Sequence, residues 1–236
     1  MKLLLISIWL AVPLAVAAYH FGPGQDLLKN DAAAVHVTAA TEAVASGDHA
    51  AAIKAYDAAL AELPAAAVTE SRQLRLARAK ERLLGSQLPV AHDELEALFA
   101  ELSKDAAADA ALKRETQTAL GMAKYYLTWL MRLEGGTEEQ WKPEIEAARQ
   151  HFRHLAEAAQ GGGQTAVLAV QRGNLESAIK LARMDLTELQ GLPLPKQCQG
   201  CCSGRCNSTA KGPPKQVPPQ DSRSAGKGPQ PDGSGS

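Results

Sequence analysis

Apolar side chains recur at the spacing of an α-helix through most of this chain. Four sets lie three or four residues apart, and each set makes one apolar stripe on a helix. No run alternates apolar and polar residues with a period of two for long enough to make a strand. The pattern therefore predicts an all-α fold. The four sets are Ile53, Tyr56, Leu60 and Leu63; Ala91, Leu95, Leu98 and Leu102; Ile145, Ala148, Phe152, Leu155 and Ala159; and Leu175, Ile179, Ala182, Leu186 and Leu189.

Residues that end or begin helices separate these stripes. Thr137, with Gln140 three residues later, has the arrangement of a capping box, and Pro143 predicts that this helix starts late or kinks near its first turn. The other predicted breaks are Gly47-Asp48, Gly85-Ser86, Gly135-Gly136, Gly161 to Gly163, and Gly173-Asn174. The chain between residues 31 and 190 is thus expected to fold as a series of helices joined by short turns.

The segment "SGDHAAAIKAYDAALAELP" (residues 46–64) resembles the second half of a tetratricopeptide repeat. The residues that carry the resemblance are Gly47 at the turn, Ala52, Tyr56, Ala59 and the closing Pro64. The first helix departs from the family pattern at His36 and Ala39, although Ala40 suits its small position. The resemblance implies antiparallel helix pairs stacked as a short α-solenoid, in which each pair buries its apolar face against its neighbours.

The same register returns less cleanly further along the chain, over about residues 66–190. A second unit has Ala79, Ser86, Ala91, Leu95 and Leu98, a third has Leu120-Gly121, Ala148, Phe152 and Leu155, and a fourth has Gly173 and Ala178. The alternative is an irregular helical bundle, because small residues at four-residue spacing arise easily in an alanine-rich chain.

In the tetratricopeptide family the first helix of each pair lines a concave groove that holds an extended peptide or a partner helix. The resemblance implies a partner-binding groove lined by Thr41, Gln73, Lys80, Glu115, Thr118, Met122, Tyr125 and Trp129. The segment "KYYLTWLMR" (residues 124–132) is the most aromatic part of the chain, and exposed aromatic side chains dominate many binding hot spots. The alternative is that Tyr125 and Trp129 belong to the core.

Residues 1–18, "MKLLLISIWLAVPLAVAA", have the layout of a signal peptide. Lys2 precedes an apolar run from Leu3 to Ala18, which is shorter than the roughly 20 residues that a membrane-spanning helix needs. Ala15-Val16-Ala17 and Val16-Ala17-Ala18 are both suitable cleavage sites. We expect an exported protein of the periplasm or cell envelope, with an uncleaved N-terminal anchor as the alternative, and a linker at residues 19–30.

Charge divides the chain into an acidic body and a basic tail. Residues 31–190 hold 17 Lys and Arg against 23 Asp and Glu, a net charge of −6, and residues 191–236 hold 6 against 2, a net charge of +4. An acidic body argues against nucleic-acid binding, because that affinity comes largely from cations that neutralise phosphates. Residues 207–236, rich in Pro, Gly and Ser, have one aliphatic side chain and predict a disordered tail.

All four cysteines lie in residues 191–206, in the pattern C-x2-C-C-x3-C: Cys198, Cys201, Cys202 and Cys206. In an exported protein we expect disulfides, either Cys198 with Cys202 and Cys201 with Cys206, or Cys198 with Cys201 and Cys202 with Cys206. Zinc bound by the four thiolates is an alternative, although structural zinc sites usually join two ligand pairs across a longer loop.

Enzyme motifs for phosphate, metalloprotease or nucleophile chemistry are missing from the sequence, and we expect no catalysis and no resident cofactor. His151, His154 and Glu157 have a spacing that would suit one metal ion, but charged neighbours favour a solvated face. We therefore expect an exported scaffold that binds a protein partner through the groove. The alternative is a metal-binding or thiol-redox protein that acts through the cysteine cluster.

Overall fold

Helices make up the regular structure of residues 2–204, the part of the chain that the computed structural model describes. No strand occurs within these residues, so the prediction of an all-α fold is confirmed. Residues 1 and 205–236 lie outside the described part. Cys206 and the predicted disordered tail at residues 207–236 are therefore not described.

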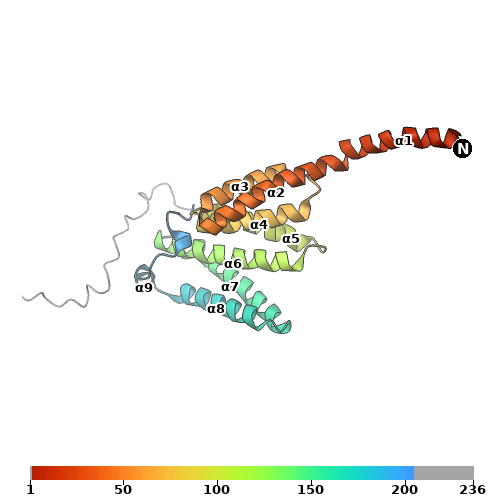
Figure 1. Cartoon of the computed structure of the whole chain (residues 1–236). Helices are drawn as coiled ribbons and strands as arrows, with labels where there is room; N and C mark the ends of the chain where they lie inside the picture. Colours follow the sequence, from red (N-terminus) through yellow and green to blue (C-terminus); the bar gives the residue numbers. More distant parts are fainter. Residues whose placement is uncertain (1, 205–236) are drawn as a thin grey trace, which may run out of the picture. The chain divides into compact units, whose positions relative to one another are not determined.

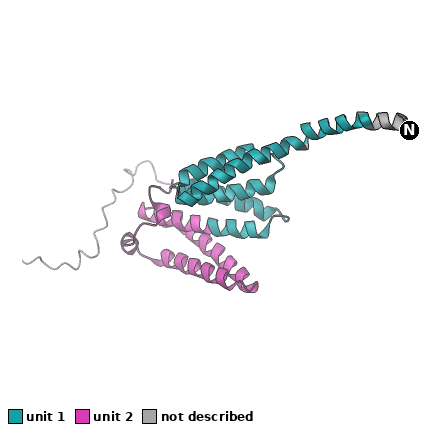
Figure 2. Ribbon diagram, in the orientation of Figure 1, with its two compact units in different colours: residues 1–120 teal, residues 121–236 magenta. Residues whose placement is uncertain are grey.

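The chain divides into two compact units, Met1–Leu120 and Gly121–Ser236, which are coloured separately in Figure 2. The boundary falls inside α6 (Ala110–Leu133). The first unit contains α1 (Lys2–Phe21), α2 (Pro23–Ser46), α3 (His49–Glu62), α4 (Val68–Leu84) and α5 (Leu88–Lys104). The second contains α7 (Glu138–Gly161), α8 (Thr165–Arg183), the short α9 (Leu186–Gln190) and a 3-10 turn, η1 (Lys196–Cys198).

In the first unit each helix packs against the next along the chain, from α2 to α5 (Figure 1). Gly47 ends α2 in the left-handed region, with φ of 75°, and the Asp48 side chain accepts a hydrogen bond of 2.9 Å from the backbone N–H of Ala51 at the start of α3. Side chains at the repeat positions then meet, because Ala40, Ala52 and Tyr56 form one buried cluster. The turn at Gly47 and the buried Ala40, Ala52 and Tyr56 thus lie where the predicted register places them.

The second predicted unit follows the same plan. Ala79, Ala91, Leu95 and Leu98 are fully buried between α4 and α5. Ser86 stands at the turn, where the pattern prefers glycine, and its φ of 61° is the left-handed conformation that a glycine would adopt more easily. The local geometry of the turn is therefore kept although the residue type is not.

In the second unit Gly121 and Phe152 bring α6 and α7 together. A Cβ added at Gly121 would lie 2.7 Å from the Phe152 ring, so only glycine leaves room for the ring against the α6 backbone. The predicted capping box is confirmed at the start of α7, where the backbone N–H of Thr137 donates to the Gln140 side chain over 2.9 Å. α7 runs from Glu138 and continues through Pro143.

The structure corrects two predicted boundaries. The break predicted at Gly173-Asn174 is wrong, because α8 is one helix through both residues and the fourth unit is not a helix pair. A glycine inside a helix costs only about 1 kcal/mol, and the buried side chains of Gln171, Ala178 and Leu181 keep one face of α8 packed. The linker predicted at residues 19–30 is also helical, apart from the break at Gly22 between α1 and α2.

Among the described residues, no helix has both the length and the apolar character that crossing a membrane requires. The large apolar side chains of α1 that are described are exposed, and they include Trp9, Val12, Leu14 and Val16. Nothing in the first unit therefore covers this part of α1.

Candidate partner-binding face and cysteine segment

The residues predicted to line a groove fall in both units. Thr41 on α2 and Gln73 on α4 are exposed, and the Thr41 hydroxyl donates to the backbone carbonyl of Val37 within its own helix. Thr118 and Met122 on α6 are partly buried. Thr41 and Gln73 are therefore available to a partner from the first unit.

Lys80 and Glu115 form an ion pair between α4 and α6 inside the first unit. Both side chains are substantially exposed, at 41% and 55%. An exposed pair of this kind is worth at most about 1 kcal/mol, so its charges stay accessible to other groups. The structure thus brings these two predicted groove residues together.

Tyr125 and Trp129 pack edge to face, with ring centroids 6.0 Å apart, and Tyr126 meets Tyr125 at 5.2 Å. Trp129 is only 7% exposed, so the expectation that it is an exposed contact is wrong. Its indole Nε1 is buried and has no hydrogen-bond partner among the residues that the structure describes. Tyr125 is half-buried, and burial raises the pKa of its phenol to about 12.

The chain's own cysteine segment explains part of this burial. The Cys198 thiol donates to the backbone carbonyl of Tyr126 at 3.7 Å, and η1 lies beside α6 (Figure 1). The pKa of Tyr125 and that of Tyr126 are raised further by their proximity to Cys198. Residues 196–203 therefore lie against the tyrosines of α6.

A second contact fixes the other end of this segment. The backbone N–H of Ser203 donates to one carboxylate oxygen of Glu134 over 2.9 Å, and the Ser203 hydroxyl donates to the other. Gly200, with φ of 69°, turns the chain between the two contacts. Glu134 and Ser203 were missed in the sequence, because nothing in a local pattern links residues 69 positions apart.

The cysteines differ in exposure. Cys198 is 1% exposed, Cys201 is partly buried and Cys202 is exposed. Cys198 and Cys202 are thiols, so the disulfides expected for Cys198 are not formed in the structure. The physical reason is that the Cys198 side chain is directed at α6, where it packs against Tyr126.

Burial raises the pKa of the Cys198 thiol to about 12, and the proximity of Cys201 and Glu134 adds to the rise. A cysteine binds a metal ion or acts as a nucleophile as the thiolate, and a lowered pKa favours that form. The raised pKa of Cys198 therefore disfavours both roles. Within residues 2–204, no three His, Cys, Asp or Glu side chains gather as a group that could hold a metal ion. This finding covers His151, His154 and Glu157, whereas the predicted fourth ligand Cys206 lies outside the described residues.

A network of ion pairs between α3, α4 and α5 was also not predicted from the sequence. Arg72 donates to Glu101 and Asp105, each over 2.7 Å, and Arg82 donates to Glu94 over 2.6 Å. Hydrogen bonds from Arg75 and Arg72 hold the pKa of Glu101 below its usual value. The arginines recur at three- or four-residue spacing along α4, a signal that could have been read as a basic face; they are Arg72, Arg75, Arg78 and Arg82.

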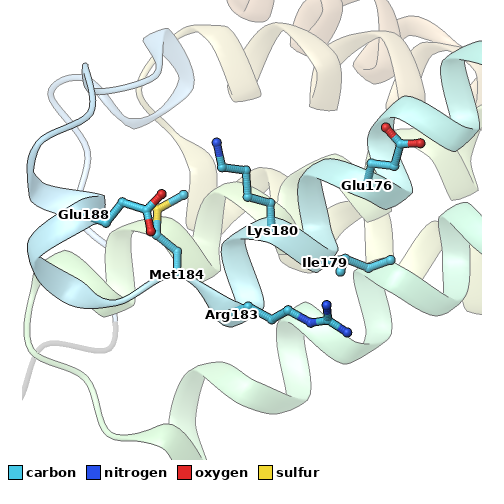
Figure 3. Close-up of a pocket in the computed structure, with 6 residues that line it drawn as sticks. All are labelled: Glu176, Ile179, Lys180, Arg183, Met184 and Glu188. Carbon is cyan, nitrogen blue, oxygen red and sulfur yellow. The ribbon is translucent and has the colours of Figure 1, made fainter.

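An open pocket of about 370 Å³ lies at the end of α8 (Figure 3). Met184, which is buried, lines it together with two acidic and two basic side chains. The charges are balanced, so the pocket favours neither an anion nor a cation. The lining residues are Glu176, Ile179, Lys180, Arg183, Met184 and Glu188.

Compared with protein-family models, curated proteins and solved structures, the chain matches none of them.

Proposed function

We propose that this chain is an exported, non-catalytic scaffold of the bacterial cell envelope that binds a protein partner through tetratricopeptide-like helix pairs. The observation that carries the proposal is the buried cluster of Ala40, Ala52 and Tyr56, which occupies the contact positions of the repeat. The small Ala40 and Ala52 let α2 and α3 approach closely, and in repeats of this kind successive pairs present their first helices on one side.

The binding surface that we propose on the first unit consists of exposed polar side chains on first helices. Thr41 and Gln73 are exposed there, and the Lys80–Glu115 ion pair offers one charge of each sign. An extended peptide or a helix with polar and charged side chains would meet complementary groups on this surface. The acidic character of residues 31–190 makes a nucleic acid a poor partner.

Site-specific photo-crosslinking tests this proposal. A photoreactive phenylalanine derivative replaces Gln73 in one chain, Thr41 in another, and Lys54, which is exposed on the second helix α3, in a matched control. After irradiation of the cells in which the protein occurs, we expect a crosslinked protein at Gln73 and Thr41 and none at Lys54. Equal crosslinking at all three positions would refute a binding surface on the first helices.

Export has its own test, because cleavage leaves a defined N-terminus. Mass spectrometry of the mature chain should find a start at Ala18 or Tyr19, according to which of the two small-residue sites is used. A chain that starts at Met1 and stays with the membrane fraction would favour the N-terminal anchor. A chain that starts at Met1 in the cytosol would refute export.

The second candidate is a metal-binding or thiol-redox protein that acts through the cysteines. It is less well supported, since the raised pKa of Cys198 keeps that thiol protonated near neutral pH. Elemental analysis of the purified chain separates the two candidates, because one zinc per chain would favour the cysteine cluster.

A further inference from the structure

We infer that residues 196–203 form a strap, an internal ligand that docks on the tyrosine side of α6 and that a protein partner must displace to bind there. The inference rests in part on the proposed function, since it adds a covered second surface to the scaffold. The strap is defined by two attachments within the second unit. Cys198 is buried beside Tyr126 at one end, and Ser203 binds Glu134 at the other.

The attachments differ in strength. The Glu134 carboxylate accepts hydrogen bonds from both the backbone N–H and the hydroxyl of Ser203, and hydrogen bonds to a charged group are stronger than neutral ones. The Cys198 contact is a weak thiol hydrogen bond together with the burial of one small side chain. Glu134 is therefore the latch, and Cys198 reports whether the strap is closed.

The strap has features of a removable cover rather than of a core element. It holds one short 3-10 turn and otherwise irregular chain, and its exposed residues include Gln199, Gly200 and Cys202. The surface that it would uncover contains the partly buried Tyr125 and Tyr126, and the partly buried Met122 lies three and four residues before them on α6. An extended peptide with a small apolar side chain and a Ser or Thr hydroxyl would replace both attachments.

Alkylation of Cys198 measures strap opening without any partner. In the full chain, Cys201, Cys202 and Cys206 are replaced by Ser, so that Cys198 is the single thiol, and the rate of its reaction with iodoacetamide at pH 8 is followed by mass spectrometry. A second chain that keeps Cys202 as its single thiol gives the rate for an exposed cysteine. We expect Cys198 to react roughly 100-fold more slowly than Cys202, because it is buried and protonated.

Variants of the latch should then form a graded series. Glu134→Ala removes both hydrogen bonds and should speed the alkylation of Cys198 about tenfold. Ser203→Ala keeps the backbone bond and should speed it about threefold. The matched control is Glu157→Ala, which removes a carboxylate that is 66% exposed on α7, and should leave the rate unchanged. A thermal melt followed by circular dichroism checks that each variant keeps its helices.

Two results would refute the strap. In the first, Cys198 is alkylated as fast as Cys202. In the second, the Glu134 and Ser203 variants show no faster alkylation of Cys198 than the Glu157→Ala control. Displacement by a partner is tested by the photoreactive residue at Met122, whose crosslinking should rise in the Glu134→Ala background. If alkylation rises and this crosslinking does not, the strap opens but does not gate a partner. A strap that is confirmed while no crosslink forms at Gln73 or Thr41 would leave this inference standing on its own and refute the first-helix surface.

Discussion

The arginine network of α4 in the first unit and the Lys124–Glu144 pair in the second unit differ in their exposure to solvent. In Met1–Leu120 the arginines of α4 meet carboxylates that are partly open to solvent, such as Asp57 at 46% and Glu101 at 38% exposure. In Gly121–Ser236 the Lys124–Glu144 pair is almost fully buried, with its atoms 2.9 Å apart. Solvent screens the first kind of pair, whereas a buried charge that loses its partner has no water to replace it. The loss of one partner is therefore expected to matter far more at Lys124–Glu144 than at the exposed pairs of α4.

Arg132 extends the contrast. Its guanidinium is buried, donates to the backbone carbonyls of Leu181 and Met184, and lies 4.7 Å from the centre of the Trp141 ring. Burial lowers the pKa of Arg132, and the nearby Asp185 carboxylate opposes that effect. The guanidinium thus satisfies carbonyls at the end of α8 that the helix itself leaves open. Arg132 therefore joins α6 to the end of α8 through a buried polar contact, whereas the long-range ion pairs of α4 in the first unit lie partly open to solvent.

The largest effect is expected from Lys124→Ala in the second unit. The variant leaves Glu144 buried without this partner, and breaking such a pair typically costs about 3–5 kcal/mol of unfolding free energy. Urea denaturation of the parent and the variant measures the loss. The double variant Lys124→Met, Glu144→Leu should recover most of it, because neither side chain is then charged. A loss below about 1 kcal/mol for Lys124→Ala would remove the contrast between the units.

A smaller effect is expected from Arg78→Ala in the first unit. Arg78 pairs with Glu94 and Asp57, but Arg82 also binds Glu94 and stays in place. We expect a loss of about 1–2 kcal/mol in urea denaturation, part of which disappears in 1 M NaCl. Arg153→Ala is the control, since its side chain is 53% exposed and its pair with Glu157 spans 3.9 Å. An Arg78→Ala loss as large as that of Lys124→Ala would contradict the comparison.

The difference between the units also explains what could be predicted from the sequence. Gly47, Ala52 and Tyr56 were placed correctly, because their roles follow from spacing within one helix pair. The sequence left open whether Trp129 is exposed or in the core, and the Glu134–Ser203 contact was not predicted, since it joins residues 69 positions apart. Periodicity identifies which helix a residue belongs to, but it does not say what covers each face.

The burial of Cys198 should make the stability of the chain depend on pH. Its pKa is raised from 9.0 to about 12 in the folded chain, so an unfolded chain loses this proton first as the pH rises. The stability from its burial is therefore complete well below pH 9 and is lost as the pH rises towards 12, by about 1.4 kcal/mol at pH 10.

Urea denaturation at pH 7.5 and pH 10 measures this loss in the chain that keeps Cys198 as its single thiol. The control has Cys198→Ala in the same background, and its loss at pH 10 should be smaller. Tyr125, whose pKa is also raised to about 12, titrates in both chains, and because its largest cause is burial, most of its contribution is common to the two. Equal losses in the two chains would mean that Cys198 is not buried in solution.

The smallest effect is expected at the turns of the first unit, where the fold depends on local backbone geometry. Ser86 adopts a φ of 61°, which glycine reaches with less strain, so Ser86→Gly should stabilise the chain by about 0.5 kcal/mol. Gly47→Ala is the opposite change: a Cβ would meet nothing within 4 Å, so its cost of about 1 kcal/mol comes from the φ of 75° alone. Thermal denaturation of both variants and the parent chain measures the two changes in stability. If Ser86→Gly destabilises the chain, side-chain bonding by Ser86 outweighs backbone strain, and the first unit depends on more than local turn geometry.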